Sequence, residues 1–187
     1  SLGANVLLKL LGEDPDAIPD NFAGAAAISP PFDSQRSAAR LHQAMGGAYV
    51  RHFLKTLIPK AALKEAQFPG CCDMRSIAHC RTFYEFDSLF TAPIHGFADA
   101  DEYWTRCSCG RFLSTIRRPV LLICALDDPF VHPESFPFAE AAASPWLYPL
   151  FPDQGGHVGF VSGASWRPAY WAEEQVQRFF HLLHFSN

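Results

Sequence analysis

The segment Pro119 to Leu126, PVLLICAL, constrains the fold of this chain more than any other part of the sequence. It is an unbroken aliphatic run of strand length, and the turn-forming residues Asp127, Asp128 and Pro129 follow it directly. An apolar run without polar alternation is typical of a strand that is buried on both faces of a parallel sheet. The sequence therefore predicts a covered parallel sheet with two carboxylates at the end of one strand.

Helices and further strands are predicted on both sides of this segment. A helix is predicted over Leu2 to Leu11, with Gly12 ending it. Strands are predicted over Phe22 to Ser29, where the alanines make a helix the competing prediction, and over Trp146 to Phe151. A closing amphipathic helix is predicted over Tyr170 to Leu183. Strands that alternate with helices indicate an α/β fold with a parallel sheet flanked by helices.

The stretch 33–118 shows helical periodicity in several pieces, which predicts a mostly helical insertion. Its large apolar side chains are expected mainly in a core, with a minority lining a pocket. They include Phe53, Leu54, Leu57, Ile58, Phe83, Phe86, Phe90, Tyr103 and Trp104. With 187 residues of which 49% are hydrophobic, the chain has enough apolar material for one domain.

Charge and hydropathy argue against nucleic-acid binding and against a membrane-spanning helix. The net charge of -4 comes from 15 basic and 19 acidic residues without a long run of either sign, so we expect no nucleic-acid binding. The longest apolar stretches, near Val6 to Leu11 and Pro119 to Leu126, are too short for a transmembrane helix.

The six cysteines do not have the spacing of a metal site. They form an adjacent pair, Cys71 and Cys72, and a C-x-C pair, Cys107 and Cys109, but no C-x-x-C pair. We therefore predict no zinc, no other metal and no cofactor. Free thiols fit a reducing compartment, which favours a cytoplasmic location.

Three polar features are placed where ligands of parallel sheets gather, beyond the carboxyl ends of strands: Ser1, the pair Asp127 and Asp128, and His157. Their order along the chain, Ser then Asp then His, is the order of the catalytic triad in α/β-hydrolases. Ser1-Leu2-Gly3 before a helix matches the second half of the G-x-S-x-G nucleophile elbow. A serine that only caps the helix is an equally good interpretation of this half-motif alone.

Several longer stretches make the resemblance specific. SLGANVLLKLLGE, FDSLFTAPIHGFADADEYW, LDDPFVHPESFP and GGHVGFV resemble the YheT-like family of α/β-hydrolases, in that family's order and over nearly the whole chain. The resemblance implies a serine hydrolase acting on carboxylic esters, with Ser1 as nucleophile, Asp128 as acid and His157 as base. It implies the C-terminal part of an α/β-hydrolase fold, parallel sheet flanked by helices, with a helical cap insertion at about 33–118.

Two choices within this assignment rest on local context. The D-P-F sequence favours Asp128 over Asp127 as the acid, which leaves Asp127 as a turn residue or hydrogen-bonding neighbour. His157 follows two glycines in the loop after the last predicted strand, whereas His132 lacks such a loop and remains the rival base. His95 is expected to be structural or to line a pocket.

The implied chemistry leaves some alternatives open. The backbone N–H of Leu2 is expected to be one oxyanion donor. The substrates implied are short- to medium-chain or lipid-type esters, with peripheral contact to lipid. Acyl transfer to an alcohol and a non-catalytic binding module are the alternatives. An N-terminal-nucleophile hydrolase would require a strand after Ser1, whereas a helix is predicted there.

The chain begins at Ser1 without a methionine or a signal-like segment. We therefore expect that the N-terminal half of the domain, with the strand that leads into Ser1, lies upstream. We also expect residues 1–187 alone to be poorly soluble and inactive, because a sheet edge would be left unpaired.

Overall fold

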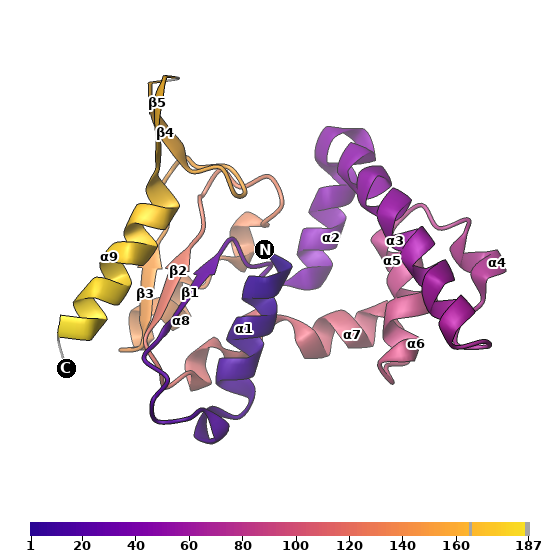
Figure 1. Ribbon diagram of the computed structural model, residues 1–187, viewed down its shortest axis with the longest axis horizontal. Coiled ribbons are helices and arrows are strands. Elements are labelled where there is room, and N and C mark those ends of the chain that lie inside the picture. The colour runs from indigo at the N-terminus through magenta and orange to yellow at the C-terminus, as the bar shows by residue number, and fades with distance from the viewer. Residues whose placement is uncertain (165, 186–187) are drawn as a thin grey trace. The chain divides into compact units, whose positions relative to one another are not determined.

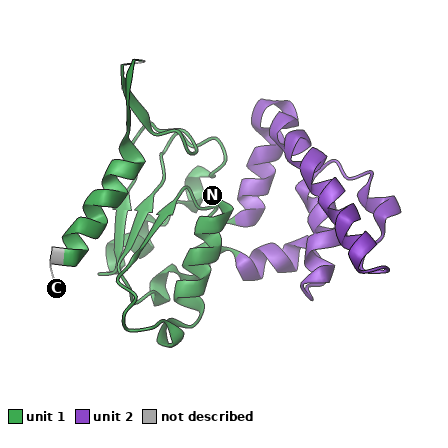
Figure 2. Cartoon of the chain, viewed as in Figure 1, with its two compact units in different colours: residues 1–33, 108–187 green, residues 34–107 purple. Residues whose placement is uncertain are grey.

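The computed structural model describes residues 1–164 and 166–185 (Figure 1). The chain divides into a sheet unit, residues 1–33 and 108–187, and a helical unit, residues 34–107 (Figure 2). The elements of the sheet unit, in chain order, are α1 (Leu2–Glu13), η1 (Pro15–Ala17), β1 (Ala25–Ile28), η4 (Cys109–Thr115), β2 (Val120–Ile123), η5 (Pro133–Ser135), α8 (Phe138–Ala143), β3 (Leu147–Leu150), β4 (Val161–Ala164), β5 (Arg167–Tyr170) and α9 (Trp171–Phe185).

A three-stranded parallel sheet in the order β1-β2-β3 forms the centre of the sheet unit. Val120 of β2 lies opposite Ala25 of β1 and Leu147 of β3. Each strand was expected from its apolar run, and the middle strand β2 is buried along its whole length. The prediction of a parallel sheet flanked by helices is therefore confirmed.

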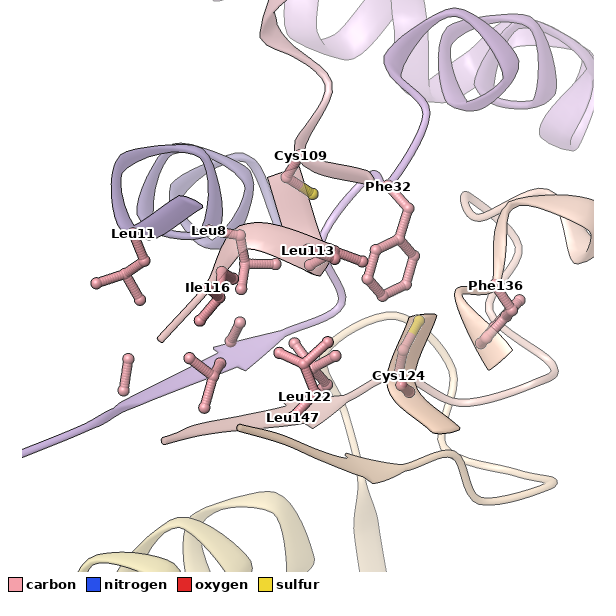
Figure 3. Close-up of a cluster of buried hydrophobic side chains, with 14 of the residues drawn as sticks. Leu8, Leu11, Phe32, Cys109, Leu113, Ile116, Leu122, Cys124, Phe136 and Leu147 are labelled. Atoms are coloured by element: carbon pink, nitrogen blue, oxygen red, sulfur yellow. The ribbon is translucent and has the colours of Figure 1, made fainter. Parts of the chain in front are cut away.

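The two faces of β2 belong to two different hydrophobic clusters. Side chains at Val120, Leu122 and Cys124 join the first cluster, which includes residues of α1 and η4 (Figure 3). The intervening side chains of β2 join the second cluster, in which α9 contributes Ala172 and Phe179. In Figure 1, α1 and α9 accordingly lie on opposite faces of the sheet. This double burial explains why β2 has an aliphatic residue at every position.

Two features of the sheet unit differ from the sequence-based expectations. Helix α1 continues through Gly12 to Glu13, because Gly12 packs closely instead of ending the helix. A Cβ atom at Gly12 would lie 2.2 Å from the carbonyl oxygen of Phe112. The antiparallel hairpin of β4 and β5 was not expected, since its residues are mostly exposed and lack an apolar run.

The helical unit consists of α2 (Ser34–Gln43), η2 (Ala44–Gly47), α3 (Ala48–Gln67), α4 (Met74–Ile77), α5 (Phe83–Phe86), the π-helical turn η3 (Asp87–Thr91), α6 (Ala92–Ile94) and α7 (Ala100–Cys107). It has its own core, to which α3 contributes Val50 and Leu54. Trp104 of α7 is buried and donates from Nε1 to Asp87 at 2.8 Å. Phe53, one of the large apolar side chains of which most are expected in a core, is 41% exposed.

The boundary of the helical unit leaves residues 108–118 with the sheet unit, although the sequence analysis includes them in the insertion. They belong there because η4 packs against α1.

Within residues 1–164 and 166–185, no helix combines the length and the apolar character that crossing a bilayer requires.

Candidate active site

Ser1 lies at the start of α1, beside the end of strand β1. Its nitrogen donates to the carbonyl oxygen of Ile28 at 2.7 Å, and its carbonyl accepts from the amides of Ala4 and Asn5 at 2.9 and 3.2 Å. In the described part of the chain, its side chain makes no capping hydrogen bond to the helix. The Ser1 hydroxyl is therefore not occupied by the bond that a helix-capping role would require.

Asp128 follows strand β2 and is 1% exposed. Its Oδ2 lies 2.8 Å from Nδ1 of His157, and its Oδ1 accepts from the backbone N–H of Phe130 at 2.8 Å. Both carboxylate oxygens are thus paired, which is what a buried charge requires. Because β1 and β2 are parallel neighbours, Asp128 and Ser1 lie near the same end of the sheet.

Asp127 has different partners from its neighbour. It is exposed, and its Oδ1 accepts from the backbone N–H groups of Gly155 and Gly156 at 3.0 and 2.9 Å. The pair of bonds ties the loop that carries His157 to the end of β2. Asp127 is thus a hydrogen-bonding neighbour that anchors the loop, while Asp128 contacts the imidazole.

The loop around His157 is shaped by its two glycines in different ways. Gly156 has a φ of +64°, a left-handed conformation in which a side chain is strained. Gly155 is crowded instead, since a Cβ there would lie 2.6 Å from the ring of Phe160 and 3.0 Å from Ala125. The imidazole lies against Phe130, with ring centroids 4.5 Å apart.

The contact with Asp128 fixes the chemical role of each imidazole nitrogen. An ionised carboxylate can only accept hydrogen bonds, so Nδ1 of His157 must carry the hydrogen that it shares with Asp128. In the neutral imidazole, Nε2 then has a free lone pair and can accept a proton. By contrast, Nδ1 of His132 accepts from the Glu134 amide at 3.2 Å and caps the short helix η5.

Ser29 is a site residue that the sequence analysis missed. It follows β1, is fully buried and has a φ of +49°, which is strained for a residue with a side chain. Its Oγ donates to the carbonyl oxygen of His157, and its N–H donates to Ile123 at 2.7 Å. No motif or spacing signals this contact, because the two residues are 128 positions apart.

The thiols near these residues are held in the protonated form. Burial, and then the charge of Asp128, raise the pKa of Cys124 well above its usual range. Burial raises the pKa of Cys109 to about 12. Neutral thiols are poor nucleophiles, so neither cysteine competes with a serine hydroxyl for this role.

The first turn of α1 offers donors for a developing negative charge. Because Leu2 and Gly3 begin α1, their backbone N–H groups have no carbonyl partner within the helix. The dipole of α1 adds partial positive charge at this end. A Cβ at Gly3 would meet no atom of the described chain within 4 Å.

Relatives with names that refer to ester chemistry match almost the whole chain. This chain is 35% identical to the YheT protein of Escherichia coli (strain K12), whose name refers to an esterase. The match covers 94% of this chain and 52% of that protein. The chain is 29% identical to the monoacylglycerol lipase of Saccharomyces cerevisiae, over 98% of this chain and 41% of the lipase. It is 28% identical to the medium-chain fatty acid ethyl ester synthase/esterase 2 of the same yeast, over 96% of this chain and 44% of that protein.

The chain thus spans about half the length of the curated relatives it matches. No family model matches it, and neither does any solved structure. The similarity to YheT agrees with the parallel sheet, the helix that begins after Ser1 and the paired His157 and Asp128. Over nearly its whole length, the chain is thus similar to the YheT-like family of α/β-hydrolases.

Proposed function

We propose that the protein is a carboxylic ester hydrolase in which Ser1 is the nucleophile, His157 the base and Asp128 the acid of the triad. The observation that carries this proposal is the 2.8 Å contact between His157 Nδ1 and the buried Asp128 carboxylate. Ser1 is anchored at the end of the neighbouring strand, with its hydroxyl free of a capping bond in the described chain.

In this mechanism, Nε2 of His157 takes the proton of the Ser1 hydroxyl as the oxygen attacks the ester carbonyl. Asp128 keeps the imidazole oriented and stabilises its charged form. The backbone N–H of Leu2, at the N-terminus of α1, donates to the oxyanion. His157 then returns the proton to the leaving alcohol, and water releases the acyl group from Ser1 by the same steps in reverse order.

The substrate class is proposed from the names of the relatives. A monoacylglycerol lipase and a medium-chain ethyl ester synthase/esterase both act, by name, on esters of fatty acids. We therefore propose short- to medium-chain or lipid-type esters as substrates, with peripheral contact to lipid and without nucleic-acid partners.

Acyl transfer to an alcohol is the second candidate function, and the synthase/esterase name of one relative favours it. Both reactions proceed through the same acyl-enzyme, and differ only in whether water or an alcohol attacks it. Product analysis in the presence of ethanol distinguishes them, since a transferase converts part of the acyl groups into ethyl ester.

The experiment that tests the proposal compares the full-length protein with its Ser1→Ala variant on a medium-chain p-nitrophenyl ester. We expect hydrolysis by the first and loss of turnover by orders of magnitude in the second. Equal turnover by both proteins would refute the assignment of Ser1. Ester binding without turnover by the unmodified protein would favour the non-catalytic binding module.

A further inference from the structure

A carboxylate and two thiols converge at the C-terminal end of α3, in the helical unit. Glu65 accepts from the backbone N–H of Gly70 at 2.6 Å through one oxygen and from that of Cys72 at 2.9 Å through the other. Gly70 has a φ of +87°, which lets the chain turn back over Glu65. The loop therefore holds the carboxylate in a fixed position.

The thiols of Cys71 and Cys72 lie close to this carboxylate. One ligand atom from each of the three residues lies within 4.8 Å of the others, and all three residues are partly exposed. In a tetrahedral site with two thiolates and one oxygen, the bonds to the cation are about 2.0 to 2.3 Å long, so the ligand atoms are roughly 3 to 4 Å apart. This separation is shorter than 4.8 Å. A small closure of the loop would therefore bring the three ligand atoms to the distances that a bound cation requires.

A divalent cation would complement the charge of this cluster once its thiols are ionised. The amides of Gly70 and Cys72 lower the pKa of Glu65 to about 2, so the carboxylate is ionised. The three groups lie within 4.8 Å of one another and repel each other when all are ionised, and a divalent cation would relieve that repulsion.

We propose that Glu65, Cys71 and Cys72 form a binding site for a divalent cation of the zinc type, with water as the fourth ligand. As each sulfur–metal bond forms, the thiol releases its proton to solvent, and Glu65 contributes one carboxylate oxygen. Two sulfur ligands select soft cations such as Zn²⁺ or Cd²⁺ over Mg²⁺ and Ca²⁺. Rules based on cysteine spacing do not find this site, because the third ligand is a glutamate of the preceding helix.

The test is a titration of the reduced, metal-free full-length protein with Cd²⁺, followed by the ultraviolet sulfur-to-cadmium charge-transfer band. We expect saturation at one Cd²⁺ per chain, displacement by Zn²⁺ and no displacement by Mg²⁺. Cys71→Ser, Cys72→Ser and Glu65→Gln should each weaken binding by about tenfold or more, by analogy with losses at supporting residues of metal sites. Cys107→Ser, which changes another partly exposed cysteine of the helical unit, should leave binding unchanged.

Circular dichroism of each variant shows whether the unit still folds. If Glu65→Gln disturbs the loop, the two serine variants carry the test, since serine replaces a thiol with little change in size. The proposal is overturned if folded Cys71→Ser and Cys72→Ser bind Cd²⁺ as tightly as the unmodified protein. It is equally overturned if Cys107→Ser loses as much affinity as they do, or if the unmodified protein shows no saturable band.

Discussion

At the scale of single residues, Asp127 and Asp128 are adjacent yet have separate tasks. Asp128→Asn is expected to lower kcat for ester hydrolysis by about 10⁴-fold, because an amide in this position favours the wrong imidazole tautomer. Asp127→Asn should cost far less, since its amide oxygen can still accept from Gly155 and Gly156. Measurement of kcat for both variants decides the matter, and a larger loss for Asp127→Asn would assign the acid to that residue.

Ser29 is expected to position the triad through the backbone of His157. Ser29→Ala should lower kcat about tenfold with little change in KM, because the hydroxyl no longer holds the His157 carbonyl. Ser29→Gly should lose the same activity but be more stable than Ser29→Ala, since glycine relieves the strain of a φ of +49°.

Ser37→Ala is the matched control, because Ser37 is a buried serine whose hydroxyl has no partner within the described residues. It should leave kcat unchanged. Unaltered kcat in Ser29→Ala would show that Ser29 has no positioning role.

The sequence indicated candidate site residues where a motif or strand end marks them, but not the contacts that they make across the fold, and it did not indicate Ser29. Asp128 and His157 were chosen from the D-P-F and G-G-H contexts, and the structure brings their side chains together. The anchoring of the loop by Asp127 depends on a contact across 28 positions, and that of Ser29 on one across 128. Such contacts arise only when β1, β2 and β3 are assembled into one sheet, which no local pattern specifies.

At the scale of elements, replacing glycine with alanine is expected to have opposite effects on stability at the two ends of α1. Gly12→Ala should lower the free energy of unfolding by about 1–3 kcal/mol, because the new Cβ meets the carbonyl oxygen of Phe112 at 2.2 Å. Gly3→Ala should leave stability unchanged or raise it by up to about 1 kcal/mol, since its Cβ would meet no atom of the described residues within 4 Å and alanine favours helix.

Urea unfolding of both variants gives the two free energies. Equal destabilisation by the two substitutions would contradict the close packing of α1 on η4, because both replace glycine with alanine in one helix.

The predictability of the elements followed their burial. Strand β2 was recognisable because both of its faces are covered, which selects an aliphatic residue at every position. The hairpin of β4 and β5 is largely exposed and contains Gly163 and Pro168, so no apolar pattern marks it. Helix α1 was found but ended too early, because the close packing of Gly12 depends on Phe112, far along the chain.

At the scale of the whole molecule, the candidate triad residues all belong to the sheet unit, and the proposed cation site belongs to the helical unit. The two sites therefore have separate tests. Loss of Cd²⁺ binding in Cys72→Ser says nothing about ester hydrolysis, and loss of hydrolysis in Ser1→Ala says nothing about the cation.

The central claim is that Ser1 is a nucleophile activated by His157 and Asp128. The most direct measurement is to treat the full-length protein with a fluorophosphonate and to locate the adduct by peptide mass spectrometry. We expect one adduct, on Ser1, and its disappearance in Ser1→Ala. An adduct on a different serine, or undiminished labelling of the Ser1→Ala protein, would contradict it.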